Sequence, residues 1–327
     1  MNRVARNVPS LIKCQLKKIP LLVCVKRFLF RAPHHNHIGL YFIKLFTWIP
    51  FLNSRVVRML IFDSAPNNTF LISSASKEFF VVSSQDKSIG RNVFIGGEYD
   101  FDKVGKALDI LGANRPSLLL VDVGANVGTI CIPAVKRGFF EKAIAIEPEP
   151  FNFGILVSNV HLNNLADKIT TYNLALGSHD SKELSFELSD TNYGDHRIKV
   201  SDDVGVFDED RRKIVKVSSD TFDKVVGEID PTGALIWMDT QGYEGYILAG
   251  ATKALMRHTP LVIEFWPYGM VRSGSYLLLK ESILNAGYKS FYNLDAGAFP
   301  IPMSPESLDN LYKQIGDKGS FTDLLIC

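Results

Sequence analysis

The stretch Leu118–Val135, LLLVDVGANVGTICIPAV, decides the fold. Apolar residues run up to Asp122, a turn follows from Gly124 to Gly128, and a helical pattern then begins. Glycines let the backbone turn sharply and leave room for a ligand close to the chain. In open parallel sheets, ligands lie at the carboxyl ends of the strands, which is where this turn falls. The stretch therefore predicts a strand, a ligand-binding turn and a helix.

Outward from this stretch, short apolar strands alternate with helices, which predicts a seven-stranded, mostly parallel sheet covered by helices on both faces. The predicted strands are Ser117–Val123, Lys142–Ile146, Ile169–Leu174, Ala234–Asp239, Pro260–Phe265, Tyr288–Asn293 and Phe321–Cys327. The predicted helices are Gly128–Arg137, Pro150–Asn163, Tyr243–Arg257 and Ser275–Ala286. A polar insertion separates the third and fourth strands, with hairpin strands expected over Lys182–Leu188 and Lys213–Ser218.

Two residues around the turn indicate which ligand it binds. Asn126 stands where the second glycine of the dinucleotide fingerprint would be, and that glycine lets a pyrophosphate approach the backbone. Glu147 ends the next strand, 147 − 124 = 23 residues after Gly124, where an acid accepts hydrogen bonds from ribose hydroxyls. A ribose without a pyrophosphate is an adenosyl group such as that of S-adenosylmethionine.

Five segments resemble successive motifs of the FkbM family of methyltransferases: VDVGANVG, EPEPFNFGILVSNVHLNN, TYNLALG, IWMDTQGYEGYILAGATKAL and PLVIEF. The resemblance implies a class I methyltransferase fold, S-adenosylmethionine as cofactor, and usually methylation of a sugar or polyketide hydroxyl. Where that family commonly has Glu-Gly after the acid of the fourth strand, this chain has Gln241–Gly242. Residue by residue, the match assigns the cofactor loop to Asp122, Gly124, Asn126 and Gly128, the ribose acid to Glu147 and the adenine side to Ala175.

The catalytic candidates are His196 and Asp239. His196 lies in the polar insertion, and imidazole titrates near neutral pH, so it is our candidate base for removing a hydroxyl proton. Asp239 ends the fourth strand and Glu264 nearly ends the fifth, where both could face the acceptor or share a cation. We expect the route without a metal. Trp266, Tyr268 and Tyr193 are candidates for stacking on a sugar ring.

Charge divides the chain into a basic arm (residues 1–62), a β-rich linker or hairpin (residues 63–100, with strands at 69–73 and 78–84) and a cofactor-binding domain (residues 101–327). The arm has 11 Lys and Arg and no acid, which leaves 36 − 11 = 25 basic against 35 acidic residues elsewhere. We expect peripheral contact of the arm with an anionic membrane, a hydroxylated small molecule or glycan as acceptor, and no nucleic-acid partner. Four scattered cysteines without CxxC spacing favour a reducing, cytoplasmic location.

Three functions of different classes remain open at this point. The leading one is an O-methyltransferase. A non-catalytic adenosyl-binding module whose arm recruits a membrane or nucleic acid is the second, and a nicotinamide-dependent oxidoreductase is the third, with the missing glycine at Asn126 against it. A nucleic-acid methyltransferase is a further possibility, against which stand the net acidic catalytic body and the lack of an Asn-Pro-Pro-Tyr-type signature at the fourth strand.

Overall fold

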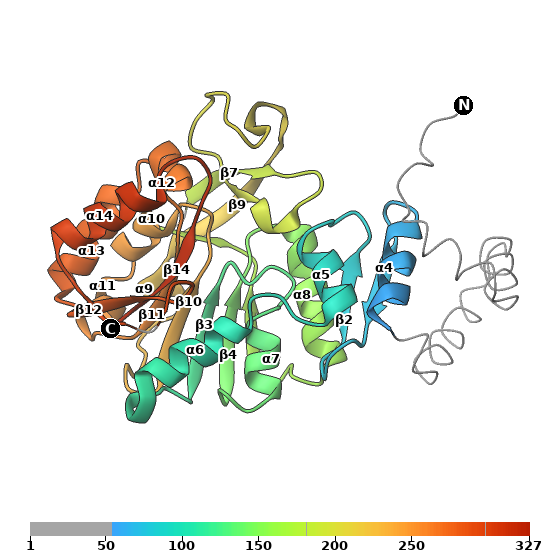
Figure 1. Ribbon diagram of the computed structural model, residues 1–327, viewed down its shortest axis with the longest axis horizontal. Coiled ribbons are helices and arrows are strands. Elements are labelled where there is room, and N and C mark those ends of the chain that lie inside the picture. The colour runs from blue at the N-terminus through green and yellow to red at the C-terminus, as the bar shows by residue number, and fades with distance from the viewer. Residues whose placement is uncertain (1–53, 181, 298) are drawn as a thin grey trace, which may run out of the picture. The chain divides into compact units, whose positions relative to one another are not determined.

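The computed structural model describes residues 54–180, 182–297 and 299–327 (Figure 1). Its main sheet has eight strands rather than the predicted seven, because a two-residue strand is added at one edge. Five neighbouring strands run parallel: β11 (Leu261–Phe265), β10 (Ala234–Met238), β3 (Leu119–Val123), β4 (Lys142–Ile146) and the edge strand β5 (Ile169–Tyr172). Strand β14 (Thr322–Ile326) is antiparallel to both of its neighbours. The strand order is β13 (Ile301–Pro302), β12 (Ser290–Asn293), β14, β11, β10, β3, β4 and β5.

Helices cover both faces of this mixed sheet. Successive strand residues point to opposite faces, so Leu120 packs in one core while Val121 and Val123 pack in the other. The first core takes in α6 (Asp102–Leu111), α7 (Cys131–Lys136) and α8 (Pro150–Leu162). The second takes in α10 (Glu244–Ala249), α11 (Thr252–Met256), α13 (Tyr276–Ala286) and α14 (Pro305–Ile315), with the short α9 (Phe222–Val225) beside them and α12 (Pro267–Ser273) after β11.

Some helix boundaries differ from the predicted ones. The predicted helix Tyr243–Arg257 is two helices, because Gly250 packs against the backbone of Gly177 so closely that a Cβ would lie 2.2 Å from its carbonyl oxygen. Helix α7 begins at Cys131 rather than at Gly128, and α14 was not predicted. No helix within the described residues is long and apolar enough to cross a membrane.

The segment before the main sheet packs against it. Strands β1 (Phe70–Ser73) and β2 (Phe80–Ser83) form the predicted antiparallel hairpin, next to α4 (Arg55–Ser64) and α5 (Ile89–Gly96). Asn159 of α8 and Asn163, which caps the carboxyl end of α8, each donate to and accept from the backbone of Val81 and Phe79, respectively. These bonds fix the hairpin on α8. Of the predicted basic arm, residues 54–62 are described and residues 1–53 lie outside the described part.

The polar insertion forms a second sheet with the order β6 (Ala175–Gly177), β9 (Lys213–Thr221), β7 (Lys182–Leu188) and β8 (Arg197–Ile198). Its antiparallel β7–β9 pair is the predicted hairpin. Two short 3-10 helices, Tyr193–Asp195 and Glu209–Arg211, lie between these strands. Figure 1 shows β7 and β9 beyond one end of the main sheet. The turn at Tyr193 lies against the loop after β3, where Asn126 donates a hydrogen bond to the carbonyl oxygen of Tyr193.

Candidate active site

A cleft lies at the carboxyl ends of β3, β4 and β10. Its empty space is about 610 Å³ when the open solvent at its mouth is counted. The main sheet, the inserted sheet and the first residue of α5 all contribute to its walls. The lining residues that bear on its chemistry are Ile89, Gly124, Asn126, Glu147, Ala175, Tyr193, His196, Ile198, Asp239, Thr240 and Tyr243.

The two predicted loop glycines have different roles. Gly124 lines the cleft with φ +85°, and a Cβ there would lie 1.9 Å from the backbone oxygen of Asp239. Gly128 does not line the cleft; its Cβ would meet Ile132 and Leu156 of the core, at 2.5 and 3.0 Å. Glycine at 124 therefore lets the loops after β3 and β10 approach each other, and glycine at 128 lets the following helix pack.

Glu147 is fixed by backbone amides at the position predicted for the ribose acid. Its Oε2 accepts from Asn126 N at 2.8 Å and its Oε1 from Glu149 N at 2.9 Å. The side chain is 4% exposed, and burial raises the pKa of Glu147 to about 8. Each carboxylate oxygen has a second lone pair, so this held carboxylate can accept hydroxyl hydrogens from a ligand in the cleft.

Asp122, predicted for the cofactor loop, does not line the cleft. Its Oδ2 accepts from Cys131 N at 3.0 Å, at the start of α7, and burial raises the pKa of Asp122 to about 7. Asn126 and Ala175, by contrast, line the cleft. Asp122 therefore supports the loop by holding the helix that follows it.

Asn126 also joins the cofactor loop to the insertion. Its backbone is left-handed with φ +50°, and its Nδ2 donates to the carbonyl oxygen of Tyr193 at 2.9 Å. Asn152 donates to the same oxygen at 3.1 Å, and Asp86 accepts from Tyr193 N at 3.4 Å. The turn at Tyr193 therefore forms a wall of the cleft held by three elements. Asp86 and Asn152 were not predicted as site residues, because no local signal in the sequence marks their contact with the insertion.

His196 lines the cleft, but its environment differs from the predicted one. Its Nδ1 accepts from Ser189 N at 3.0 Å, so the hydrogen of the neutral ring is on Nε2. Burial, with a smaller contribution from the nearby Arg212 charge, lowers the pKa of His196 to about 4. The ring is thus neutral near pH 7 and presents a donor, whereas we expected an imidazole that titrates near neutral pH and accepts a proton.

Asp239 and Glu264 are bridged by one amide. Gln241 Nε2 donates to Asp239 Oδ1 at 2.9 Å and to Glu264 Oε2 at 3.0 Å. Burial raises the pKa of Asp239 to about 6, and burial together with the Asp239 charge raises the pKa of Glu264 well above its usual range. Near neutral pH the pair therefore holds one proton, mainly on Glu264. In the described part of the chain, no three His, Cys, Asp or Glu side chains are grouped as for a metal ion.

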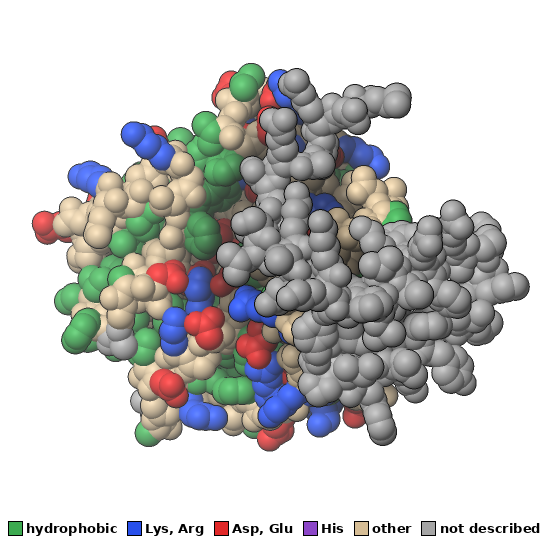
Figure 2. All heavy atoms as spheres, turned by 45° about the vertical axis from the view of Figure 1, so that its right-hand side comes forward, with side chains coloured by type: hydrophobic (Ala, Val, Ile, Leu, Met, Phe, Trp, Pro, Cys, Tyr) green, Lys and Arg blue, Asp and Glu red, His purple; other side chains and the backbone are tan. Residues whose placement is uncertain are grey.

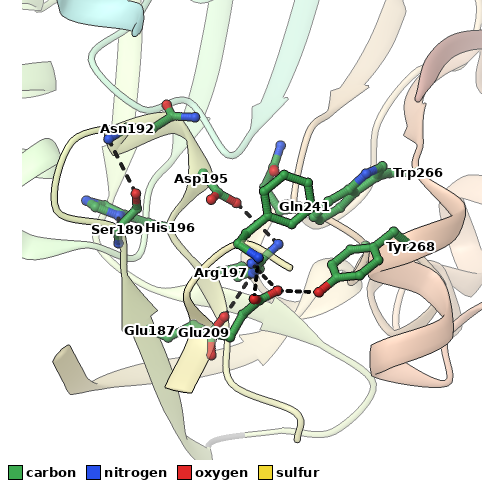
Figure 3. Close-up of polar contacts among 12 residues, drawn as sticks. Glu187, Ser189, Asn192, Asp195, His196, Arg197, Glu209, Gln241, Trp266 and Tyr268 are labelled. Atoms are coloured by element: carbon green, nitrogen blue, oxygen red, sulfur yellow. Dashed lines mark hydrogen bonds and ion pairs between the residues drawn. The ribbon is translucent and has the colours of Figure 1, made fainter. Parts of the chain in front are cut away.

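A second, smaller cleft adjoins the first and shares Ile198 and Tyr243 with it; its empty space is about 300 Å³ when open solvent is counted. Its other lining residues are Glu187, Arg197, Val200, Gln241, Gly242, Gly269, Arg272 and Ser273. Figure 3 shows Arg197 among the acids Glu187, Glu209 and Asp195. The predicted stacking residues Trp266 and Tyr268 line neither cleft; Tyr268 Oη donates to Glu209 Oε1 at 2.7 Å, and the Trp266 ring lies 5.0 Å from the Arg197 guanidinium.

The parallel strands, the glycine turn and the held acid at the end of the second strand define a methyltransferase-like α/β protein. Residues 122–290, 169 of the 327, match the family model described as "Methyltransferase FkbM domain". The chain belongs to this family of methyltransferases. The resemblance of the sequence motifs is thereby confirmed.

Similar proteins include one curated relative and two solved structures. A tRNA(Phe) (4-demethylwyosine(37)-C(7)) aminocarboxypropyltransferase of Pyrococcus horikoshii is 40% identical over 60 residues, which are 18% of this chain and 21% of that protein. The crystal structure of methyltransferase FkbM from Methylobacillus flagellatus KT is 21% identical with a TM-score of 0.39, over 64% of this chain and 44% of that one. P. horikoshii TYW2 in complex with MeSAdo is 15% identical with a TM-score of 0.36, over 80% of this chain and 73% of that one. This chain thus spans a fifth of the curated relative and less than half of the M. flagellatus protein.

The family makes S-adenosylmethionine the cofactor of this chain, and the residues of the larger cleft fit it. Glu147 offers a fixed carboxylate to the ribose hydroxyls, and Gly124 in the wall of the cleft lets the loops after β3 and β10 lie close together. When bound, the cofactor supplies a methyl group on a positively charged sulfur.

Proposed function

We propose that this methyltransferase transfers the methyl group to a hydroxyl oxygen of a sugar, a glycan or a similar hydroxylated small molecule. The observation that supports this most is the position of Asp239. It lines the cofactor cleft, and through Gln241 it connects to the smaller polar cleft. A carboxylate between the two clefts is placed to receive a proton from an acceptor hydroxyl.

In the proposed reaction, the acceptor oxygen attacks the methyl carbon while its proton passes to Asp239. A C–O bond forms, the S–CH₃ bond breaks, and the sulfur keeps the bonding electron pair. A base works best when its pKa lies near the working pH, and the pKa of Asp239, about 6, leaves the carboxylate ionised at neutral pH. Gln241 keeps the Asp239 carboxylate oriented by its hydrogen bond. The Nε2–H group of His196 can donate a hydrogen bond to the acceptor or to the cofactor.

The test uses S-adenosylmethionine tritiated in the methyl group, with a panel of methyl glycosides and cell-envelope glycans as acceptors. Asp239→Asn should lower kcat by about 10²–10⁴ while cofactor affinity is unchanged, because a positioned base contributes that much. The matched control is Asp167→Asn, an exposed acid outside both clefts. For the parent, kcat/KM should rise with pH through about 6. Full activity in Asp239→Asn would contradict the proposed base.

A second label separates this reaction from that of the curated relative, whose name describes aminocarboxypropyl transfer. Radioactivity that reaches the acceptor from a carboxyl-labelled cofactor, and not from a methyl-labelled one, would overturn O-methylation. Cofactor binding without transfer to any hydroxylated acceptor would favour a non-catalytic adenosyl-binding module.

A small neutral acceptor also fits the charge of the protein better than a nucleic acid does. Residues 63–327 hold 25 basic and 35 acidic side chains, a balance of −10. Among the described side chains visible in Figure 2, acidic and basic ones are intermingled. Proteins that bind nucleic acids instead gather Lys and Arg on one face.

A further inference from the structure

His196 lies between the cofactor cleft and a cluster of buried charges. Its backbone is extended, with φ −76° and ψ 135°, and side chains of an extended segment point alternately to opposite sides. The imidazole of His196 lines the cleft, whereas its neighbours Asp195 and Arg197 contact each other on the other side, where Arg197 also pairs with Glu187 at 2.9 Å. Figure 3 shows His196 beside Ser189 and apart from the acids around Arg197. The charge cluster therefore lies behind the ring as seen from the cleft.

Arg212 is a buried cation that holds this segment in place. Its side chain is 4% exposed, and its guanidinium pairs with the carboxylate of Asp195. Its Nη1 donates to the carbonyl oxygen of Asp195 at 2.6 Å, and its Nη2 donates to the carbonyl oxygen of Phe207 at 2.9 Å. Because Asp195 directly precedes His196, these contacts fix the backbone that carries the ring. The ring itself is fixed by Ser189, whose N–H donates to Nδ1 at 3.0 Å.

The charge of Arg212 also acts on the ring. Burial lowers the pKa of His196, and the Arg212 charge adds to this effect, so that the pKa is about 4. The other ionisable groups near the ring are Tyr193, whose ring centroid lies 5.2 Å away, and Glu147, Asp239 and Tyr243, which line the same cleft. A cation behind the ring thus opposes a second positive charge on the ring.

We infer that Arg212 is a positioning residue that keeps His196 an uncharged hydrogen-bond donor in the wall of the cofactor cleft. The reason lies in the cofactor, which carries a positive charge on its sulfur. An imidazolium in the same cleft would repel that sulfur, and such repulsion is strong where burial excludes water. The neutral ring instead offers its Nε2–H group without adding charge. The inference goes beyond the proposed O-methylation, since it concerns the cofactor and holds for any acceptor.

The first measurement follows the protonation of His196 by NMR, with its Cε1–H signal assigned by the loss of that signal in His196→Gln. In the parent, the signal should stay in place from about pH 8 to about pH 5.5. Arg212→Gln should raise the pKa of His196 by about one unit or more, as expected for the loss of a unit charge within about 10 Å at an effective dielectric constant of about 20. Arg212→Lys keeps the charge and should keep the low pKa. The matched control is Arg211→Gln, which changes the neighbouring side chain, 80% exposed, and should behave as the parent.

The second measurement compares S-adenosylmethionine with S-adenosylhomocysteine, whose sulfur is uncharged, by calorimetric titration. Glu147 and Asp239 titrate in the parent and in the variant alike, so the two proteins are compared at the same pH. At about pH 5, Arg212→Gln should shift the ratio of the two affinities toward S-adenosylhomocysteine about twofold or more relative to the parent, because part of its His196 is charged. At about pH 8 the ratio should equal that of the parent.

Circular dichroism and the melting temperature report whether each variant is folded. If Arg212→Gln does not fold, Arg212→Gln combined with Asp195→Asn serves in its place, because a buried ion pair is replaced by uncharged groups at less cost than it is broken. The double variant also lacks the Arg212 charge and should raise the pKa of His196 in the same direction. A folded variant without the Arg212 charge that keeps the parent pKa and affinity ratio would overturn the inference, and so would an equal rise in Arg211→Gln or Arg212→Lys. None of these measurements uses an acceptor, so O-methylation is tested separately.

Discussion

Replacing each loop glycine with alanine separates the part of the loop that serves the cofactor from the part that serves packing. Both Gly124 and Gly128 have positive φ, +85° and +94°, so alanine adds backbone strain of about 1–3 kcal/mol at either site. The steric consequences differ. At Gly124 the new Cβ would lie 1.9 Å from a backbone oxygen, where ordinary contact needs 3.4 Å or more. The loops after β3 and β10 would have to separate by about 1.5 Å.

That separation moves Asp239 and the floor of the cofactor cleft, so Gly124→Ala should weaken S-adenosylmethionine binding about tenfold or more. At Gly128 the neighbours are the ends of the Ile132 and Leu156 side chains, which can shift within the core. Gly128→Ala should lower the free energy of unfolding but change cofactor affinity less than about threefold. Urea denaturation and calorimetric titration measure the two quantities. Equal loss of cofactor affinity in both variants, or parent-like affinity in Gly124→Ala, would refute this reasoning.

Three further predictions concern titratable groups. Glu147→Ala should weaken cofactor binding by about 1.5–3 kcal/mol. The cofactor affinity of the parent should rise with pH through about 8, because only the ionised Glu147 accepts hydrogen bonds from both ribose hydroxyls. Calorimetric titrations that show neither the weaker binding nor the rise with pH would exclude the ribose contact. His196→Ala should lower the rate of methyl transfer but leave the shape of the rate-against-pH curve unchanged near pH 6.5, because the pKa of this imidazole is about 4. A step near pH 6.5 in the curve of the parent that is missing from the curve of the variant would contradict this. The melting temperature should fall from about pH 6.5 to 8.5, because acids whose folded pKa exceeds the unfolded value lose stabilising protons there; a rising value would contradict the burial effects on Asp122, Glu147 and Asp323.

The sequence predicted the features that local patterns determine. Buried parallel strands are continuous apolar runs, so β3, β4, β10 and β11 were placed within one or two residues. The position of Glu147 also followed, since β4 pairs with β3 and both end at the same edge. The sequence indicated that Gly124 and Gly128 are needed in the turn. It did not indicate which contacts require a glycine at each position, because those contacts are with Asp239 and Leu156, which are distant in the sequence.

Features set by distant contacts could not be predicted. His196 was taken as a titrating loop histidine because its partner, Ser189 N, is a backbone group with no mark in the sequence. Asp86 and Tyr193 are 107 residues apart yet hydrogen-bonded. Charged residues in a polar insertion are usually solvated, so the burial of Arg197 was invisible until the strands that enclose it were placed.

Gln241 lies between two buried acids, at the position where the family resemblance leads us to expect glutamate. Its Nε2 uses both hydrogens, one for Asp239 and one for Glu264. A third carboxylate there would bring three negative charges together, which a buried site tolerates only with protons or a cation. A neutral amide instead holds the two acids in place while they share one proton. The same group that orients Asp239 thereby leaves one carboxylate ionised near neutral pH, as removal of a hydroxyl proton requires.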